Sequence, residues 1–261
     1  MTPAERASAV AFALRNCALE AMEPGDATMR AAARYQHGDI DVDGLIDAAD
    51  QSTDAMRKRL ADGSLDETAR DRADSVFART VLLAQRGWEP SGDLAELVAI
   101  HRGLFDGVFD DAGRLRGSDV ARGKTDDTRR ARNPEAFFPA VLIETGAHNI
   151  AMELAEKRNL TVMDRVEFVR ELAHILDELG YLHPFRGGNA MTLRIFVSRL
   201  AHDAGWDLDW GTVTRSEYKE AKHAAYRGDT TGFERMFDRI CRPANPTRIC
   251  LIAGWDQGPA H

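Results

Sequence analysis

Nine consecutive residues combine side chains that could transfer a proton next to a bound phosphate. They are Tyr181-Leu-His-Pro-Phe-Arg-Gly-Gly-Asn189. Histidine titrates near neutral pH, so His183 is suited to act as a general base. Gly187 and Gly188 can adopt positive φ and let the backbone come close to a ligand. The stretch therefore predicts a loop that handles a phosphate group.

The elements expected on either side would turn this loop into an anion site. Hydrophobic residues at three- and four-residue spacing predict a helix from about Asp164 to Gly180, and a second helix leaves after Asn189. The free N–H groups at the start of that helix, together with its dipole, attract negative charge. Arg194, about one turn into the helix, could hold a phosphate through two hydrogen bonds. The alternative is that the glycines only end one helix and begin another, with His183 a partly buried polar residue.

The rest of the sequence also predicts helices, so we expect an all-α fold. The expected helices cover residues 3–22, 27–36, a short helix ending near 49, then 66–86, 94–108, 135–157 and a pair over 214–240. Asp26 would cap the second helix, and Asp41 or Asp43 the third. Residues 113–134, rich in glycine and charge, predict an exposed loop or short hairpin. We expect three parts: residues 1–60, a main domain over 61–242, and an irregular tail over 243–261.

Composition excludes several classes of protein. The 261 residues carry a formal charge of −8, which argues against a surface that wraps nucleic acid. Three widely spaced cysteines predict neither disulfides nor a zinc site. The start has no signal peptide and no run of 18 apolar residues occurs, which predicts a cytoplasmic protein without a membrane segment. Delivery by a secretion system that needs no cleavable signal stays open. The spacing of the histidines predicts no zinc site.

The order of residues in the loop closely resembles the signature of the Fic family, His-Pro-Phe-x-x-Gly-Asn-x-x-x-x-Arg. Segments 100–105, 111–116 and 205–210 also resemble the family, so the likeness covers about 95–240. It implies a Fic-type helical bundle that transfers AMP from ATP to a protein hydroxyl. The resemblance also implies a role for each matching residue: His183 as the base, Phe185 as the loop's anchor, Gly188 and Asn189 as the anion nest, Arg194 on the terminal phosphate, and Lys124 and Thr125 in the flap that aligns a target.

Three positions depart from the family pattern. Gly187 replaces the acidic residue that holds Mg²⁺, so the ion would have only phosphates and water to bind. Ala190 replaces a glycine, and Met191 replaces an arginine that would stabilise the leaving diphosphate. Three alternatives follow: AMP transfer that is weak or altered, a degenerate Fic-fold protein that binds a nucleotide or a partner, or metal-free chemistry on another phosphate substrate.

The first fifty residues resemble the small antitoxin that accompanies some Fic toxins. In the inhibitory helix of such proteins, a motif of Ser or Thr, three residues, Glu, then Gly or Asn places its Glu against the last arginine of the loop. Asn16-Cys-Ala-Leu-Glu20-Ala21 stands where that motif would fall, although Asn16 and Ala21 deviate from it. The resemblance implies an antitoxin-like unit within the same chain, in which Glu20 pairs with Arg194 and inhibits the enzyme. The alternative is that Glu20 is one solvated residue of an amphipathic helix.

Overall fold

The computed structural model describes residues 1–61, 72–120 and 136–244. These residues form two compact units. Unit 1 comprises the described residues within 1–88 and 102–112. Unit 2 comprises 89–101 and the described residues from 113 onward. The two units share one helix, because α5 (Leu94–Phe105) crosses from unit 2 into unit 1 after His101.

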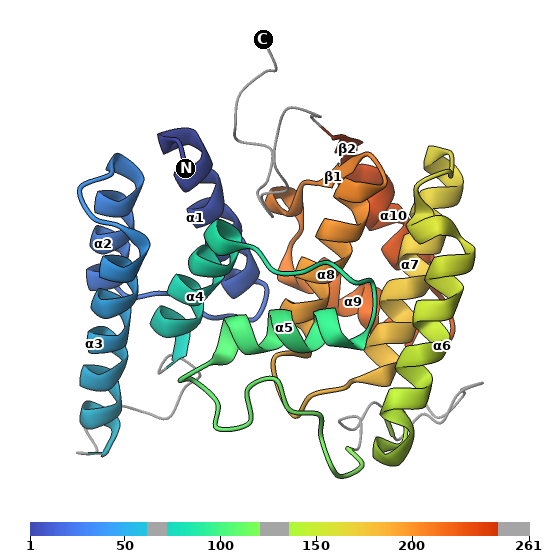
Figure 1. The fold of residues 1–261 in the computed structure, drawn as a ribbon, viewed down its shortest axis with the longest axis horizontal. Helices are drawn as coiled ribbons and strands as arrows, with labels where there is room; N and C mark the ends of the chain where they lie inside the picture. Colours follow the sequence, from blue (N-terminus) through green and yellow to red (C-terminus); the bar gives the residue numbers. More distant parts are fainter. Residues whose placement is uncertain (62–71, 121–135, 245–261) are drawn as a thin grey trace. The chain divides into compact units, whose positions relative to one another are not determined.

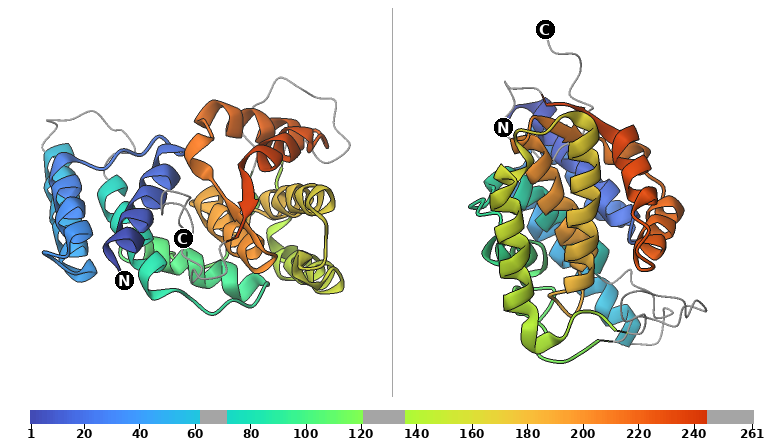
Figure 2. Two further views of the ribbon diagram at one scale, coloured as in Figure 1. Left: turned by 90° about the horizontal axis from the view of Figure 1, so that it is seen from above. Right: turned by 90° about the vertical axis from the view of Figure 1, so that its right-hand side faces the viewer.

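Unit 1 is built from four helices, α1 (Pro3–Ala18), α2 (Asp26–His37), α3 (Val42–Ala61) and α4 (Ala73–Arg86). Helix α4 packs against α1 and α3, and α2 lies beside α3 (Figure 1 and the left view of Figure 2). Tyr35 is fully buried here and its hydroxyl donates to Gln85 Oε1 at 2.7 Å. Helix α4 therefore packs in the same unit as the first three helices.

Three expectations for this unit are wrong in detail. The first helix ends at Ala18 rather than near 22, because the chain turns there toward Gly25, whose N–H donates to Asp74 Oδ1 at 2.7 Å. Gly25, and not Asp26, is the N-cap of α2. Helix α3 continues to Ala61 instead of ending near 49. Its predicted cap by Asp41 is confirmed, since Gly44 N donates to Asp41 Oδ1 at 2.9 Å.

Unit 2 is a bundle closed by a small sheet. Beside the first part of α5, its elements are η2 (Ala140–Leu142), α6 (Ile143–Glu156), η3 (Arg158–Leu160), α7 (Arg165–Leu182), α8 (Asn189–Asp203), β1 (Trp206–Leu208), η4 (Trp210–Thr212), α9 (Arg215–Ala225), α10 (Thr231–Ile240) and β2 (Cys241–Pro243). Helix α7 packs against α6, α8 and α10, and its neighbour α6 runs alongside it (Figure 1). The predicted all-α fold is confirmed.

Helix α8 forms the centre of the core. Every residue from Met191 to Ala201 is buried, as expected for a helix covered on all sides. Asp164 is the N-cap of α7: its carboxylate accepts the Glu167 N–H at 2.9 Å, a cap that contributes about 1 kcal/mol. The antiparallel pair β1–β2, with Asp207 opposite Arg242, was not expected from the sequence. Most of the loop predicted for 113–134 and of the tail lies outside the described residues.

Among the described residues, no helix is both long and apolar enough to cross a membrane.

Candidate functional site

The loop between α7 and α8 begins with a residue in an unusual backbone conformation. His183 has φ 46° and ψ 60°, in the left-handed region, and its N–H donates to Leu179 O at 3.2 Å. A residue other than glycine in this region costs about 1 kcal/mol or more, and it persists only where its surroundings hold it. The sequence explains why the helix stops here, because Pro184 disfavours helical geometry at the residue before it.

Asn189 connects the two ends of the loop through its side-chain amide. Its Oδ1 accepts the Phe185 N–H at 3.0 Å, and its Nδ2 donates to Phe185 O at 2.7 Å. Since Oδ1 must face that N–H, the orientation of the amide is fixed, and Nδ2 is the atom 3.1 Å from His183 Nε2. Nε2 therefore accepts a hydrogen bond and carries no proton. This leaves His183 as a neutral imidazole, the form in which it can act as a base.

The His183 ring is also held by aromatic packing. Phe137 stacks on it with ring centres 3.7 Å apart and planes within 9° of parallel. The edge of Tyr226 packs against the same Phe137, with ring centres 6.0 Å apart. These contacts restrict rotation of the imidazole, so that the orientation of Nε2 is set before any ligand binds.

His101 on α5 contacts the loop through a hydrogen bond and a stacked ring. Gly113 N donates to His101 Nδ1 at 2.8 Å, so the ring proton lies on Nε2, which donates to Gly187 O at 3.0 Å. The buried Phe185 stacks on the same imidazole at 3.9 Å. His101 is 1% exposed. Through its two ring nitrogens it connects Gly113, in a turn after α5, with Gly187, the position where the family has an acidic residue.

Arg116 binds the same loop through backbone carbonyl groups. Its guanidinium donates to His183 O at 2.7 Å, to Leu182 O at 3.3 Å, to Ser118 O at 3.0 Å and to Phe138 O. The side chain is 0% exposed, and burial lowers the pKa of the guanidinium from its ordinary value. The carbonyl dipoles stabilise its charge where water cannot.

The start of α8 is open to an anion. Its N-cap is Gly188, in the left-handed region with φ 73°, and within the described part of the chain no side chain caps this end of the helix. Gly188 O accepts the Thr192 N–H at 3.1 Å, so the helix is fully formed from its first turn. The first N–H groups and the helix dipole therefore present partial positive charge next to His183.

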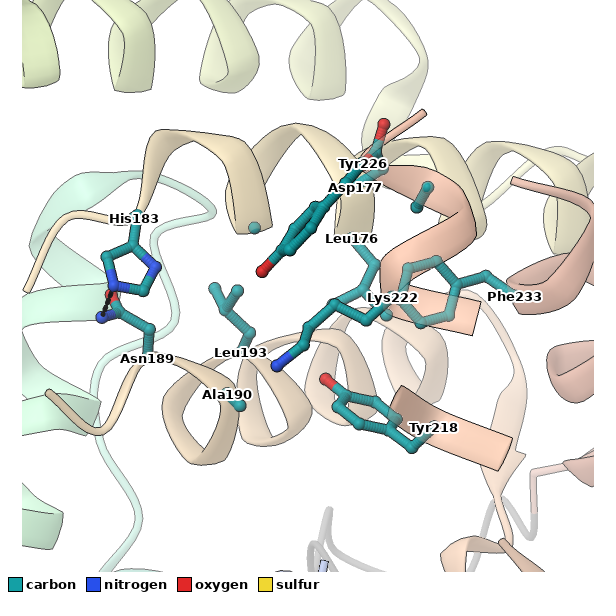
Figure 3. Close-up of a pocket in the computed structure, with 12 residues that line it drawn as sticks. Leu176, Asp177, His183, Asn189, Ala190, Leu193, Tyr218, Lys222, Tyr226 and Phe233 are labelled. Carbon is teal, nitrogen blue, oxygen red and sulfur yellow. Dashed lines mark hydrogen bonds between the residues drawn. The ribbon is translucent and has the colours of Figure 1, made fainter. Parts of the chain in front are cut away.

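A pocket begins at this end of α8 and continues toward α9 and α10. Its empty space, including the part open to solvent, is about 430 Å³. It is lined by Leu176, Asp177, Gly180, His183, Asn189, Ala190, Leu193, Tyr218, Lys222, Ala225, Tyr226 and Phe233. Figure 3 shows Lys222 reaching from α9 between the two tyrosines, with its ammonium directed toward the side of the pocket formed by α8. The pocket thus combines aromatic surface with a cation and the imidazole.

Two positions of the sequence motif, both on α8, lie deeper than the pocket wall. Arg194 is 1% exposed, and its guanidinium carbon lies 5.1 Å from the ring centre of Tyr218, which lines the pocket. Met191 is also 1% exposed and packs in the core. The position at which the family has a second arginine therefore contributes packing here and no charge. The other predicted loop residues, including Gly187 and Ala190, lie at the site as described above.

Glu20 lies just beyond α1 in a tight turn. Its N–H donates to Cys17 O at 2.9 Å, and Ala21 after it has φ 57°. Glycine or asparagine is favoured in that conformation, and these are the residues that the family motif has there. Ala21 departs from the motif in residue type, and its backbone adopts the left-handed conformation that the motif's Gly or Asn favours. The helical position expected for Glu20 is wrong, because α1 ends at Ala18.

Two further expectations concern the flap and metal ions. Lys124 and Thr125, the predicted flap residues, lie outside the described residues. Within the described ranges, no group of three or more histidine, cysteine or acidic side chains is arranged to hold a metal ion.

Sequence reasoning missed several residues that shape the site. His101 and Arg116 were seen only as parts of a resemblance, and Phe137 was not noted. Tyr218 and Lys222 on α9 and Tyr226, the residue directly after it, recur every four residues, which places them on one side of the helix. That spacing is a signal that could have identified the pocket wall from the sequence.

Comparisons with known proteins show which family this chain resembles. A model of the Fic/DOC family matches residues 91–201. The "Probable protein adenylyltransferase Fic" of Escherichia coli is 32% identical over 151 residues, which are 58% of this chain and 70% of that protein. The protein adenylyltransferase VbhT of Bartonella schoenbuchensis is 33% identical over 183 residues, which are 69% of this chain. The match spans only 36% of VbhT.

Solved structures show the same fold. The BepC protein of Bartonella tribocorum, determined with bound AMPPNP, superimposes with a TM-score of 0.56 at 24% identity. The alignment covers 65% of this chain and 84% of that one.

Proposed function

Because the chain belongs to the Fic/DOC family, we propose that it transfers AMP from ATP to a hydroxyl group on a protein. Several of its relatives carry the name protein adenylyltransferase. The observation that supports this activity best is the placement of His183 Nε2, free of its proton, beside the uncapped start of α8. A base and an anion site lie at one end of a pocket that is lined by aromatic side chains.

In the proposed reaction, the hydroxyl oxygen of the target attacks the α-phosphorus of ATP. The bond to the bridging oxygen breaks, diphosphate leaves, and the hydroxyl proton passes to His183 Nε2. For this transfer the hydroxyl must replace the Asn189 amide as the donor to Nε2. The released Nδ2–H is then available to a phosphate oxygen. Asn189 would thereby hold the base ready before the substrates bind and contact phosphate afterwards.

Positive groups around the pocket would hold the phosphates. The first N–H groups of α8 would bind oxygen atoms of the chain of phosphates, with Arg194 behind them. Mg²⁺, when bound to ATP, neutralises phosphate charge. The loop does not fit an ion held by the protein there, because Gly187 offers no carboxylate. Lys222, on α9, lines the same pocket and would supply a further positive charge.

We propose further that Glu20 inhibits this activity from within the chain, as part of an antitoxin-like segment. The resemblance of residues 16–21 to the inhibitory motif supports this role, and so does the left-handed backbone at Ala21. A carboxylate opposite Arg194 would occupy the guanidinium that otherwise binds phosphate.

Incubation of the full chain with labelled ATP and candidate target proteins tests the proposal. Label should appear on a protein, disappear in His183→Ala and increase in Glu20→Gly. An exposed carboxylate elsewhere on unit 1 supplies the matched control, Glu23→Gly. Absence of label from ATP, GTP, UTP and CTP, even with Glu20→Gly, would exclude nucleotidyl transfer.

A second candidate is a catalytically degenerate protein of the same fold that binds a nucleotide or a partner. The burial of Met191 favours it, because the leaving diphosphate then lacks one source of positive charge. Calorimetric titration with Mg-ATP distinguishes both candidates that bind a nucleotide from a protein with a purely structural role. A nucleotide-binding chain should bind Mg-ATP, and the binding should depend on Arg194. The triple change Gly187→Glu, Ala190→Gly and Met191→Arg tests this second candidate directly. If the original chain is inactive and this variant gains activity, the second candidate is correct.

A further inference from the structure

We infer that Arg116 is a positioning residue. It fixes His183, the proposed base, by binding the backbone on both sides of it. This inference rests on the proposed role of His183 as the base. Arg116 does not line the pocket, its side chain is 0% exposed, and it donates to the backbone carbonyl of His183, not to the imidazole. It therefore acts on the base indirectly.

Arg116 contacts the peptide planes around His183. The conformation of a residue is set by the planes before and after it. The guanidinium of Arg116 binds Leu182 O, which belongs to the plane before His183, and His183 O, which belongs to the plane after it. The backbone N–H of Arg116 also donates to Pro184 O at 2.9 Å, in the following plane. One residue thus holds three successive planes.

This arrangement explains how His183 stays in the left-handed region. At φ 46° the backbone is strained for a residue with a side chain, and it relaxes unless neighbouring groups hold it. The direction of the Cα–Cβ bond, and with it the position of Nε2 relative to Asn189, depends on that conformation. Loss of Arg116 would allow the planes to turn and would move the imidazole away from Asn189.

The guanidinium also binds the segment that supplies the ring stacked on His183. It donates to Phe138 O, and Phe138 N donates to Tyr181 O at 3.0 Å. Phe137, the preceding residue, stacks on the imidazole. Arg116 therefore holds both the backbone of His183 and the backbone next to the ring that covers it. A planar fork with five N–H donors can serve four carbonyl groups, whereas a lysine ammonium has three donors at one point.

Substitution of Arg116 in the full chain tests this inference by two kinds of measurement. The first is the NMR spectrum of the histidine rings, with the His183 signals assigned from His183→Ala. The second is label transfer, split into kcat and the Kd for ATP. Arg116→Met and Arg116→Lys are compared with Arg79→Met as a matched control. Arg79 is also a largely buried arginine that donates to a backbone carbonyl, Asp106 O at 2.5 Å, within unit 1.

We expect Arg116→Met to shift the His183 ring signals and to lower kcat about tenfold or more, with the Kd for ATP changed less than about threefold. Arg116→Lys should recover part of both effects, and Arg79→Met should show neither. If Arg116→Met does not fold, the ring signals of Arg116→Lys must still move. Unchanged His183 signals in a folded Arg116 variant would overturn the inference. The ring signals need no activity, so they decide the matter even if the wild-type chain transfers no label.

Discussion

Asn189 Nδ2 lies 3.1 Å from His183 Nε2, and the same amide binds both backbone groups of Phe185. The base of the proposed reaction is thus prepared by a residue six positions farther along the chain. One side chain fixes the protonation state of the imidazole and the shape of the loop that carries it. Four predictions concern this site and described residues elsewhere in the chain.

Replacement of Asn189 by aspartate should remove the base at neutral pH. One carboxylate oxygen can still accept the Phe185 N–H, but the other would face His183 Nε2 as a second acceptor. This contact becomes favourable only if Nε2 carries a proton, so the imidazolium would persist to higher pH. Label transfer near pH 7 should fall about a hundredfold, and its pH profile should move upward. Asn149→Asp, the same change at an exposed position of α6, is the control. A pH profile of Asn189→Asp equal to that of Asn149→Asp would contradict the prediction.

Lys222→Met should weaken the binding of phosphates and leave the binding of the nucleoside unchanged. The ammonium lies in the pocket, where a charge-assisted contact is worth about 1.5 to 3 kcal/mol, or roughly a tenfold to hundredfold change in Kd. Calorimetry with ATP, AMP and adenosine measures this difference. Lys219→Met changes an exposed lysine of the same helix and should have no effect. An equal loss for adenosine and ATP would place Lys222 on the base or the ribose instead.

Ala21→Gly should stabilise the protein. Ala21 has φ 57°, and the left-handed conformation costs a residue with a Cβ about 1 to 2 kcal/mol. Glycine removes that cost but adds about 0.4 to 1 kcal/mol of unfolded-state entropy, so a net gain of roughly 0.5 to 1 kcal/mol is expected. The midpoint of urea unfolding, followed by circular dichroism, should rise. Ala18→Gly, at an exposed helical position, should instead lower it; the same direction of change in both variants would refute this account.

Cys241 should be unreactive in the folded protein. Burial raises the pKa of its thiol to about 11, so at pH 8 the reactive thiolate is about a hundredfold rarer than in an unperturbed thiol. In a Cys250→Ser chain, Ellman's reagent should modify the thiols only after unfolding. Because the folded state holds the proton more strongly, the associated stability is present below the ordinary thiol pKa and declines as pH rises toward 11. Rapid modification of Cys241 under native conditions would show that the thiol is accessible.

The sequence alone determined the helical fold and the place of the loop. The three- and four-residue spacing from Val166 to Leu179, with Asp164 before it, is local information, and it predicted α7 within two residues at its C-terminal end. The same holds for the pair α9 and α10. Where local signals were weak, prediction failed: α3 runs twelve residues beyond its expected end near Ala49, and the β1–β2 pair joins residues more than thirty positions apart.

The sequence also identified His183, Asn189 and the start of α8, because these lie within a few residues of one another. It did not identify the groups that set their geometry. Arg116, Phe137 and His101 come from distant segments, and only the folded backbone brings their donors and rings to the loop. Local spacing determines which groups a loop contains. Tertiary packing decides which peptide planes are held and which imidazole nitrogen bears the proton, because those depend on partners that are remote in the sequence.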